Sequence, residues 1–464
     1  MQPSSAPPNR TESIREMTVT RARADWTLIV AMDCQALGTW PMSVSLAGVE
    51  SLTVGRGVRA ERRLVVNGAE ARLDLTDRWA SRDHARFVKA GERWVVEDCA
   101  SRNGVWVNAE RVERKGLRDG AVVECGGTFF VLRRTEGVIA DEGPLAARAE
   151  ALRTMSPKLA EELVIARKIA RSSLPVVVLG ESGTGKEGTA RAIHALSGRE
   201  GPFVAVNCGA IPPTLIESEL FGSRRGAFSG AEDRAGVLRS ADRGTLFLDE
   251  FAELPLESQA ALLRALQEKE VVALGSTRPI SVDVRIVAAT NRPIGALVDE
   301  GKLRRDFVAR LSGYELNLPA LRDRREDLGV LVATLIARHD RSGRPRTLSG
   351  SAARRLFAYE WPLNIRELER CLAAALAVVR GEIALEHLAP AVRGEERLSS
   401  DGNDYKRRLI GMIRRLRGNM SAVARELGTS RTQLYRILSR HSIRPADLRP
   451  SGLPPIPPGD YFLP

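Results

Sequence analysis

The chain has 464 residues, of which 43% are hydrophobic and 28% are charged. This length exceeds one hydrophobic core and predicts roughly three domains, and the ordinary composition excludes a wholly disordered or fibrous protein. The net charge of +12 suits a protein that meets a polyanion, although a basic surface alone explains it equally well.

The five cysteines, at positions 34, 99, 125, 208 and 371, never fall at metal-ligand spacing, which favours a reducing compartment. The apolar stretch at 371–379 is far too short for a membrane span. Residues 1–25 are rich in Pro, Ser and Arg and contain no apolar signal core, so we expect them to be disordered and the protein to be cytoplasmic.

Residues 26–134 alternate short apolar runs with Gly, Asn and Asp, as in WTLIVAM, SLTVGR, ARFVKA, RWVVED, GVWVN and TFFVLRR. This pattern predicts an all-β sandwich. A linker is expected at 135–150. Residues 151–393 then carry the near-continuous apolar runs PVVVLG, FVAVNC, GTLFLDE and VRIVAATN, separated by helical patterns such as LESQAALLRALQEKE. Buried parallel strands have this character, so we expect an α/β domain with a helical lid.

The C-terminal part begins with a polar linker at 394–403. Residues 404–445 are basic with helical periodicity, and 446–464 form a Pro-rich tail. The predicted chain is therefore multidomain, with an all-β domain, an α/β domain and an all-α domain in that order.

A phosphate-binding loop follows the strand PVVVLG. Its sequence GESGTGKE fits GxxxxGK between a strand and a helix, which is the context of a P-loop. The predicted ATP-binding residues are Gly180, Glu181, Ser182, Gly183, Thr184, Gly185, Lys186 and Glu187. Glu187 stands where most P-loops have the Ser or Thr that holds magnesium.

Two acidic residues, Asp249 and Glu250, end the strand GTLFLDE. Beside a P-loop, such a strand tip predicts that Asp249 holds Mg²⁺ and that Glu250 orients the attacking water. The expected cofactors are therefore ATP and Mg²⁺, with hydrolysis as well as binding.

From about residue 151 to 393 the sequence resembles the AAA+ domain of sigma-54-dependent transcriptional activators, or bacterial enhancer-binding proteins. The resemblance covers GESGTGKE, VAVNCGAIPPTLIESELFG, GAFSGA, GTLFLDE, LQEKEV, VDVRIVAATN, LRRDFVARL, LPALRDRREDL and WPLNIRELE. It implies an ATPase that remodels the sigma-54 RNA polymerase closed complex.

The same resemblance assigns further roles. Asn207 would restrain the catalytic Glu250, Thr290 and Asn291 would lie near the γ-phosphate, and Arg366 would reach the nucleotide from the lid. Arg304 and Arg310 match arginine fingers that enter a neighbouring subunit's site, which implies a ring, by analogy a hexamer. Leu363 replaces a usual glycine, and Val308 and Ala309 replace usual aromatics, which affects local packing more than chemistry.

The segment GAFSGA resembles the family's sigma-54 contact loop, which normally reads GAFTGA. It consists of Gly226, Ala227, Phe228, Ser229, Gly230 and Ala231. Serine keeps the hydroxyl but lacks the threonine methyl, worth about 1 kcal/mol when buried. We expect reduced or retuned activation.

The stretch NMSAVARELGTSRTQLYRILSRHSI resembles the Fis-type helix-turn-helix that ends most of these activators. Ser430 is the expected N-cap of the second helix, and Arg431, Thr432, Gln433 and Arg436 are the expected DNA-binding residues. Arg414, Arg415 and Arg417 would contact phosphates. A small helical dimerisation bundle is the alternative.

The N-terminal sandwich resembles a forkhead-associated (FHA) domain in four short segments around Gly55-Arg56, Ser81-Arg82-Asp83-His84, Ser101-Arg102-Asn103-Gly104 and Val107-Asn108. The resemblance assigns phosphothreonine binding to Arg56, Ser81, Arg82, Arg102 and Asn103, with His84 bracing the loops. An arginine with a hydroxyl suits a dianion. A sandwich kept only as a scaffold is the alternative, because the segment between Arg56 and Ser81 reads as a long, arginine-rich loop.

The sequence therefore predicts a sigma-54-dependent activator that binds upstream double-stranded DNA and senses a Ser/Thr phosphorylation signal. Its expected partners are sigma-54 polymerase, DNA, a phosphothreonine protein such as a kinase or its substrate, and copies of itself, from a dimer to a hexamer. Two alternatives remain. One is a different AAA+ machine such as an unfoldase, and the other is a DNA- and phosphopeptide-binding regulator with impaired remodelling.

Overall fold

A computed structural model describes residues 25–39, 41–58, 61–135, 152–227, 232–340 and 344–394, and parts of 409–443. The chain forms two compact units, Met1–Ala389 and Pro390–Pro464, and each is considered by itself. Within the described ranges, no helix is long and apolar enough to cross a membrane.

The N-terminal part is the expected all-β sandwich of two six-stranded sheets. One sheet has the order β2-β1-β12-β11-β8-β9 and the other β10-β7-β6-β3-β5-β4. The strands are β1 (Asp25–Asp33), β2 (Met42–Ser45), β3 (Ser51–Arg56), β4 (Arg63–Asn67), β5 (Glu70–Leu75), β6 (Ala85–Ala90), β7 (Arg93–Asp98), β8 (Val105–Val107), β9 (Glu110–Val112), β10 (Arg114–Leu117), β11 (Val122–Cys125) and β12 (Thr128–Thr135).

The segment between Arg56 and Ser81 is not one long loop, as its arginines suggested, because it contains the β4–β5 hairpin. β5 runs parallel to β3, and Leu73 and Leu75 on β5 are buried. β4 is an edge strand whose side chains are half-buried or exposed. An edge strand needs no apolar alternation, so its composition carries little strand signal.

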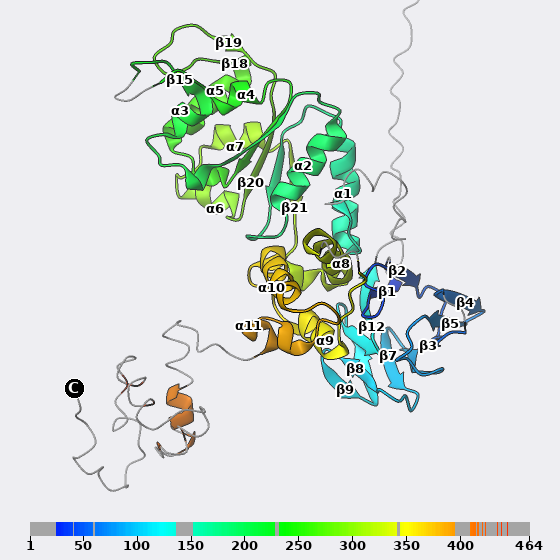
Figure 1. Ribbon diagram of the computed structural model, residues 1–464. Helices are drawn as coiled ribbons and strands as arrows, with labels where there is room; N and C mark the ends of the chain where they lie inside the picture. Colours follow the sequence, from blue (N-terminus) through cyan, green and yellow to red (C-terminus); the bar gives the residue numbers. More distant parts are fainter. Residues whose placement is uncertain are drawn as a thin grey trace, which may run out of the picture. The chain divides into compact units, whose positions relative to one another are not determined.

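The second part is a three-layer α/β domain with a parallel five-stranded sheet in the order β14-β17-β20-β13-β21. Helices α1 and α2 cover one face of this sheet and α3 to α7 the other (Figure 1). The strands are β13 (Val176–Leu179), β14 (Phe203–Asn207), β17 (Thr245–Asp249), β20 (Arg285–Thr290) and β21 (Tyr314–Asn317). The helices are α1 (Pro157–Ala170), α2 (Lys186–Ser197), α3 (Ile216–Phe221), α4 (Val237–Ser240), α5 (Leu256–Glu268), α6 (Ile294–Asp299) and α7 (Arg305–Leu311), with the short helices η3 (Cys208–Ala210) and η4 (Phe251–Glu253).

The four apolar runs of the sequence are therefore the strands β13, β14, β17 and β20. The fifth strand, β21, has the sequence YELN and lies at the sheet edge, where only Leu316 is buried. Two short ribbons lie apart from the main sheet: β15 (Gly222–Ser223) with β16 (Arg234–Ala235), and β18 (Glu270–Val271) with β19 (Ile280–Ser281).

A helical lid follows the sheet. Its helices are η5 (Leu321–Asp323), η6 (Arg325–Asp327), α8 (Leu328–His339), α9 (Gly350–Ala358), α10 (Asn364–Val378) and η7 (Leu385–His387). The side chain of Ser349 caps α9 by accepting a hydrogen bond from the amide of Ala352.

The C-terminal unit contains α11 (Pro390–Arg393) and a small apolar core. The buried members are Leu409, Ile413, Met420, Val423, Leu434, Leu438 and Ile443. Three of the successive pairs, Leu409 with Ile413, Met420 with Val423, and Leu434 with Leu438, are spaced by three or four residues, as helical periodicity requires. The predicted DNA-binding residues Ser430, Arg431, Thr432, Gln433 and Arg436 lie outside the described residues, as do Arg414 and Arg417.

Candidate functional site

The P-loop connects the end of β13 to the start of α2. Three glycines of the P-loop have positive φ values: 155° at Gly180, 79° at Gly183 and 103° at Gly185. Residues that carry a Cβ rarely adopt this backbone conformation. At Gly183 a Cβ would lie 2.2 Å from the carbonyl oxygen of Leu363. These glycines therefore let the backbone curl tightly under the lid.

Lys186 begins α2 and lies inside this loop. Its ammonium group donates hydrogen bonds to the carbonyl oxygens of Gly180 and Glu181, at 2.9 and 3.0 Å. Burial lowers the pKa of Lys186, while the carboxylates of Asp249 and Glu250 act in the opposite direction. Lys186 is thus a partly buried cation that faces two acidic groups.

Asp249 and Glu250 stand at the carboxyl end of β17, as predicted. The backbone of Glu250 is left-handed, with φ of 52°, and its amide donates to Asp249 Oδ1 at 3.1 Å. Parallel strands place their carboxyl ends at one edge of a sheet, so these acids lie beside the P-loop.

Asn207 ends the neighbouring strand β14. Its Oδ1 accepts a hydrogen bond from the amide of Ala210 at 3.1 Å and so caps η3. A Cβ at Gly209 would lie 2.6 Å from Glu250 Oε2 and 3.5 Å from Asn207 Oδ1. Asn207 and Glu250 are therefore neighbours across Gly209.

Thr290 ends the strand β20, and Asn291 follows it. The carbonyl oxygen of Thr290 accepts a hydrogen bond from the amide of Gly180 at 3.3 Å, and its buried hydroxyl accepts one from the amide of Arg292 at 3.1 Å. Thr290 thus links its strand to the P-loop. Asn291 is exposed at the strand end.

A cleft of about 750 Å³ joins these groups. It is lined by the P-loop from Ser182 to Thr189, by Asn207, Asp249 and Glu250, and by Arg324 and Arg366 of the lid region, among others. Arg366 donates a hydrogen bond to Ser182 Oγ at 3.1 Å. The P-loop, the two acids and the lid arginine therefore share one site.

A second group of residues, which the sequence reasoning did not assign, fixes the P-loop from outside. Arg322 pairs with both carboxylate oxygens of Glu181, and Asn364 Nδ2 donates to Glu181 at 3.1 Å. These hydrogen bonds lower the pKa of Glu181 to about 2. Arg324 donates to the carbonyl oxygen of Thr184 at 2.7 Å. Both arginines belong to the motif LPALRDRREDL, which was the sequence feature that could have indicated their contact with the P-loop.

Arg304 and Arg310 do not reach this cleft. Arg304 forms a paired contact with Asp306 at 3.1 and 2.8 Å, and Arg310 donates to the carbonyl oxygen of Leu266. Both side chains belong to exposed residues. The structure therefore does not bring them to the P-loop of their own chain.

The GAFSGA segment starts on the β15–β16 ribbon. Gly226 has φ of 86°, and the amide of Ala227 donates to the carbonyl oxygen of Arg224 at 3.1 Å. The ribbon also bonds to the strand region near Leu274 through Arg224 and Gly222. The remaining residues, Phe228, Ser229, Gly230 and Ala231, lie outside the described residues.

In the sandwich, Arg56 at the end of β3 and the loops that carry Ser81, Arg102 and Asn103 are joined by hydrogen bonds. The backbone amide of Arg56 donates to the carbonyl oxygen of Ser81 at 2.8 Å, and the amide of Arg102 donates to Ser81 Oγ at 3.0 Å. Asn103 Nδ2 donates to the carbonyl oxygen of Trp79 at 2.7 Å. The neighbouring Arg82 is exposed.

His84 is fully buried beneath these loops. Its Nδ1 accepts a hydrogen bond from the amide of Ser81 at 2.9 Å, which leaves Nε2 to donate to the carbonyl oxygen of Gly104 at 3.1 Å. Burial lowers the pKa of His84, so the neutral ring braces both loops. At Gly55 a Cβ would lie 1.9 Å from the carbonyl oxygen of Arg82, so only glycine fits there.

This fold and site define a P-loop ATPase domain attached to a β-sandwich. Comparison with known proteins gives the family. Residues 152–317 match the Sigma-54 interaction domain, 322–404 the AAA+ ATPase lid domain, and 52–126 the FHA domain.

Comparison with individual relatives indicates the same family. The chain is 40% identical to the Transcriptional regulatory protein GlrR of Escherichia coli (strain K12) over 316 residues, which is 65% of this chain and 70% of that protein. It is 44% identical to the Response regulator protein PilR of Pseudomonas aeruginosa over 58% of this chain and 65% of that protein. The crystal structure of NtrX from Brucella abortus is 32% identical, with a TM-score of 0.50, over 64% of this chain and 71% of that one. The chain belongs to the family of sigma-54-dependent transcriptional activators, and it carries an FHA domain.

Proposed function

We propose that this protein activates sigma-54-dependent transcription by hydrolysing ATP in a ring and remodelling the closed polymerase complex. The observation that carries the proposal is the single cleft in which Lys186, Asp249 and Glu250 meet the lid arginine Arg366. This arrangement suits phosphoryl transfer, in which positioning and charge stabilisation do most of the work.

Different residues of this chain would bind the nucleotide and orient the attacking water. The P-loop amides and Lys186 would bind the ATP phosphates, and Glu250 would orient the attacking water. The carboxylate of Asp249 lies in the same cleft and is a suitable oxygen ligand for Mg²⁺. When bound, the ion would neutralise charge on the phosphates. Asn207, beside Glu250 across Gly209, would set the position of that carboxylate.

Arg304 and Arg310 would complete the site of a neighbouring subunit. Both are exposed and neither lines the cleft of its own chain. A guanidinium supplied in trans makes hydrolysis depend on assembly, and family resemblance favours a hexamer. Thr290 and Asn291 would report the state of the γ-phosphate from the end of β20.

Input and DNA binding belong to the other two parts. The loops that carry Arg56, Ser81, Arg82, Arg102 and Asn103 would bind a phosphothreonine peptide. The C-terminal basic helices would bind DNA upstream of the promoter through Ser430, Arg431, Thr432, Gln433 and Arg436. Output would pass through GAFSGA, with Phe228 as its apolar tip and Ser229 as its hydroxyl.

Capture of sigma-54 tests this function. The full chain is incubated with ADP, aluminium fluoride and purified sigma-54, and complexes are separated on a native gel. We expect sigma-54 to be retained by the wild type and lost with Phe228→Ala. Val164→Ala, which shortens an exposed apolar residue of α1 on the other face of the sheet, is the matched control. A wild type that hydrolyses ATP but retains no sigma-54 would favour the regulator without remodelling activity.

A further inference from the structure

The FHA domain packs closely against the ATPase lid of its own chain. Phe129 of β12 stacks on Phe357 of α9, with ring centroids 4.8 Å apart and nearly parallel planes. The amide of Leu348 donates to the carbonyl oxygen of Cys34 at 2.9 Å. At Gly329, a Cβ would lie 1.9 Å from the carbonyl oxygen of Ala31, so α8 touches β1 backbone to backbone. We call this surface the FHA–lid interface.

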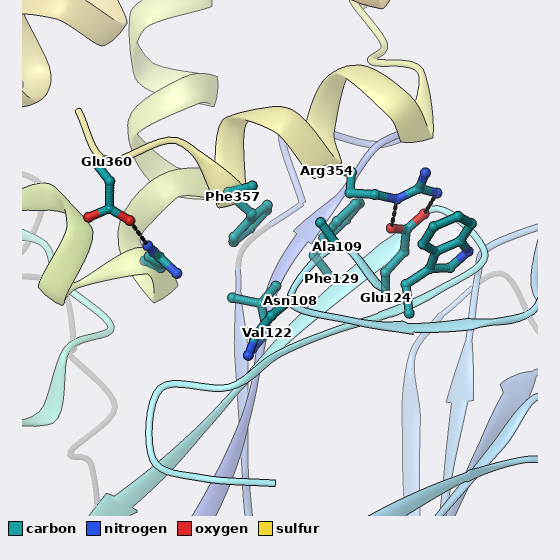
Figure 2. Close-up of a pocket in the computed structure, with 11 residues that line it drawn as sticks. Asn108, Ala109, Val122, Glu124, Phe129, Arg354, Phe357 and Glu360 are labelled. Carbon is teal, nitrogen blue, oxygen red and sulfur yellow. Dashed lines mark hydrogen bonds and ion pairs between the residues drawn. The ribbon is translucent and has the colours of Figure 1, made fainter. Parts of the chain in front are cut away.

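Two ion pairs cross the FHA–lid interface. Arg354 of α9 donates to both oxygens of Glu124 at 2.7 and 2.8 Å, and its guanidinium lies 3.6 Å from the ring centroid of Trp106 (Figure 2). Arg133 donates to Oε2 of the buried Glu326 at 3.0 and 2.6 Å. Removing one partner of a buried ion pair is strongly destabilising, because the remaining charge stays buried without compensation.

The FHA–lid interface contains an unpartnered polar atom and a cavity. Glu326 Oε1 is buried without a hydrogen-bond partner, and a cavity of about 140 Å³ lies beside Glu124, Phe129 and Phe357 (Figure 2). Protein cores are normally close-packed and their polar groups satisfied. The unpartnered atom and the cavity leave this interface room to rearrange.

One short segment joins the FHA–lid interface to the nucleotide site. Arg322 of η5 and Arg324, which stands between η5 and η6, contact the P-loop at Glu181 and Thr184. Asp323, which stands between these two arginines, accepts a hydrogen bond from Arg133 of the FHA domain through its carbonyl oxygen. Glu326, two residues after Arg324, accepts another from Arg133 through its carboxylate. A shift of the FHA domain would therefore act on residues adjacent to those that hold the P-loop.

The phosphothreonine loops connect to the same interface from the other side. Asn103 bonds to the carbonyl oxygen of Trp79, and the amide of Trp79 donates to Asp77 Oδ1 at 2.8 Å. Asp77 Oδ2 accepts from the amide of Gly127, at 2.6 Å, and from the Thr128 hydroxyl. Gly127 lies in the turn between β11 and β12. Glu124 of β11 and Phe129 of β12 contact the lid.

We propose that the FHA–lid interface couples phosphothreonine binding to ATP binding within one subunit. The route runs from the Ser81 and Asn103 loops through Asp77 and the β11–β12 turn to the lid, and through Arg133 to η6 and the P-loop. This inference rests on the proposed phosphothreonine function. Because coupling is reciprocal, the peptide must change ATP affinity by the same factor by which ATP changes peptide affinity.

The test measures binding of a fluorescent, non-hydrolysable ATP analogue to the full chain by anisotropy, with and without a phosphothreonine peptide selected from an oriented library. Peptide affinity is measured separately by calorimetry. For the wild type we expect saturating peptide to change the analogue's Kd at least fivefold, and saturating analogue to change the peptide's Kd by an equal factor. Factors of one, with both ligands binding, would overturn the coupling and leave the proposed function standing.

Two interface variants assign the coupling to this surface. Replacing both Glu124 and Arg354 by Met removes one ion pair without leaving a lone buried charge. Its matched control replaces Glu97 and Arg114 by Met, because they form an exposed pair on the opposite sheet. We expect the interface variant to shift the analogue's Kd at least fivefold without peptide and to reduce both coupling factors to one. An unchanged Kd would contradict the proposal even if no peptide binds.

Gly329→Ala provides a second disruption that changes no charge. Its control is Gly350→Ala, because Gly350 faces the same FHA surface but a Cβ there would meet only ordinary contacts, the nearest at 3.5 Å from Glu124. Thermal unfolding of all variants shows whether they fold. Gly329→Ala should reproduce the shift in analogue affinity and Gly350→Ala should not. Equal behaviour of the two would overturn the role of the interface.

Discussion

Arg354 and Glu124 lie 230 residues apart in the chain and form a two-point ion pair between the ATPase lid and the FHA domain. The FHA domain lies in the same compact unit as the nucleotide site. The contact shows that the lid has a defined partner on its own subunit.

Replacing the proposed catalytic base should separate binding from turnover. Glu250→Gln removes the carboxylate that would orient water but leaves the P-loop and Lys186 intact. We expect unchanged affinity for the ATP analogue and a fall in kcat of about 100- to 10,000-fold. Phosphate release is the measurement, and Glu257→Gln, on the exposed first turn of α5, is the control. Retained hydrolysis would assign the base elsewhere.

The phosphothreonine site can be tested at one guanidinium. Arg56→Ala should weaken binding of a phosphothreonine peptide by about tenfold to a hundredfold, since a charge-assisted hydrogen bond contributes about 1.5 to 3 kcal/mol. Calorimetry on the full chain measures the loss. Arg93→Ala, an exposed arginine on β7, should bind normally. If Arg56→Ala binds as the wild type does, the site lies on other loops.

Mixing inactive variants tests whether the arginine finger acts between subunits. Removal of such a finger lowers kcat by about 10³ to 10⁵, so Arg310→Ala alone should be inactive, as should Glu250→Gln. Mixed rings should regain part of the ATPase activity, because some sites then combine an intact Glu250 with a neighbour's intact Arg310. If mixing restores nothing while mixed rings form, the finger does not act in trans.

The buried His84 makes the FHA loops sensitive to acid. Its pKa is lowered by burial, so its contribution to stability is complete above the unfolded-state pKa of about 6.5 and is lost as the pH falls through the folded value. Urea unfolding between neutral pH and pH 5 should show this loss. His84→Asn keeps an acceptor but does not titrate, so its stability should fall less steeply. Identical slopes would show that another group is responsible.

Much of the fold follows from local pattern, but edge strands do not. Apolar runs predicted β13, β14, β17 and β20 because both faces of a central parallel strand are buried. The edge strands β4 and β21 have few buried side chains, so RLVVN and YELN carry little signal. The prediction of a β-sandwich was therefore correct, but the β4–β5 hairpin within it was wrongly predicted to be a loop.

The site was predictable where a motif carries the chemistry. The P-loop glycines, Asp249 and Glu250 lie together because the parallel strands β13 and β17 end at the same edge of the sheet, on either side of β20. The clamp of Arg322 on Glu181 and the pair of Arg133 with Glu326 were not anticipated. Charged residues normally indicate exposed surface, and only tertiary packing shows that Glu326 is buried against an arginine 193 residues earlier.

The most direct measurement of the central claim is open-complex formation by purified sigma-54 RNA polymerase on promoter DNA, with the full chain and ATP. The account predicts open complexes that require ATP, disappear with Glu250→Gln, and become more abundant with Ser229→Thr. ATP hydrolysis by the wild type without any open complex, and without rescue by Ser229→Thr, would contradict it.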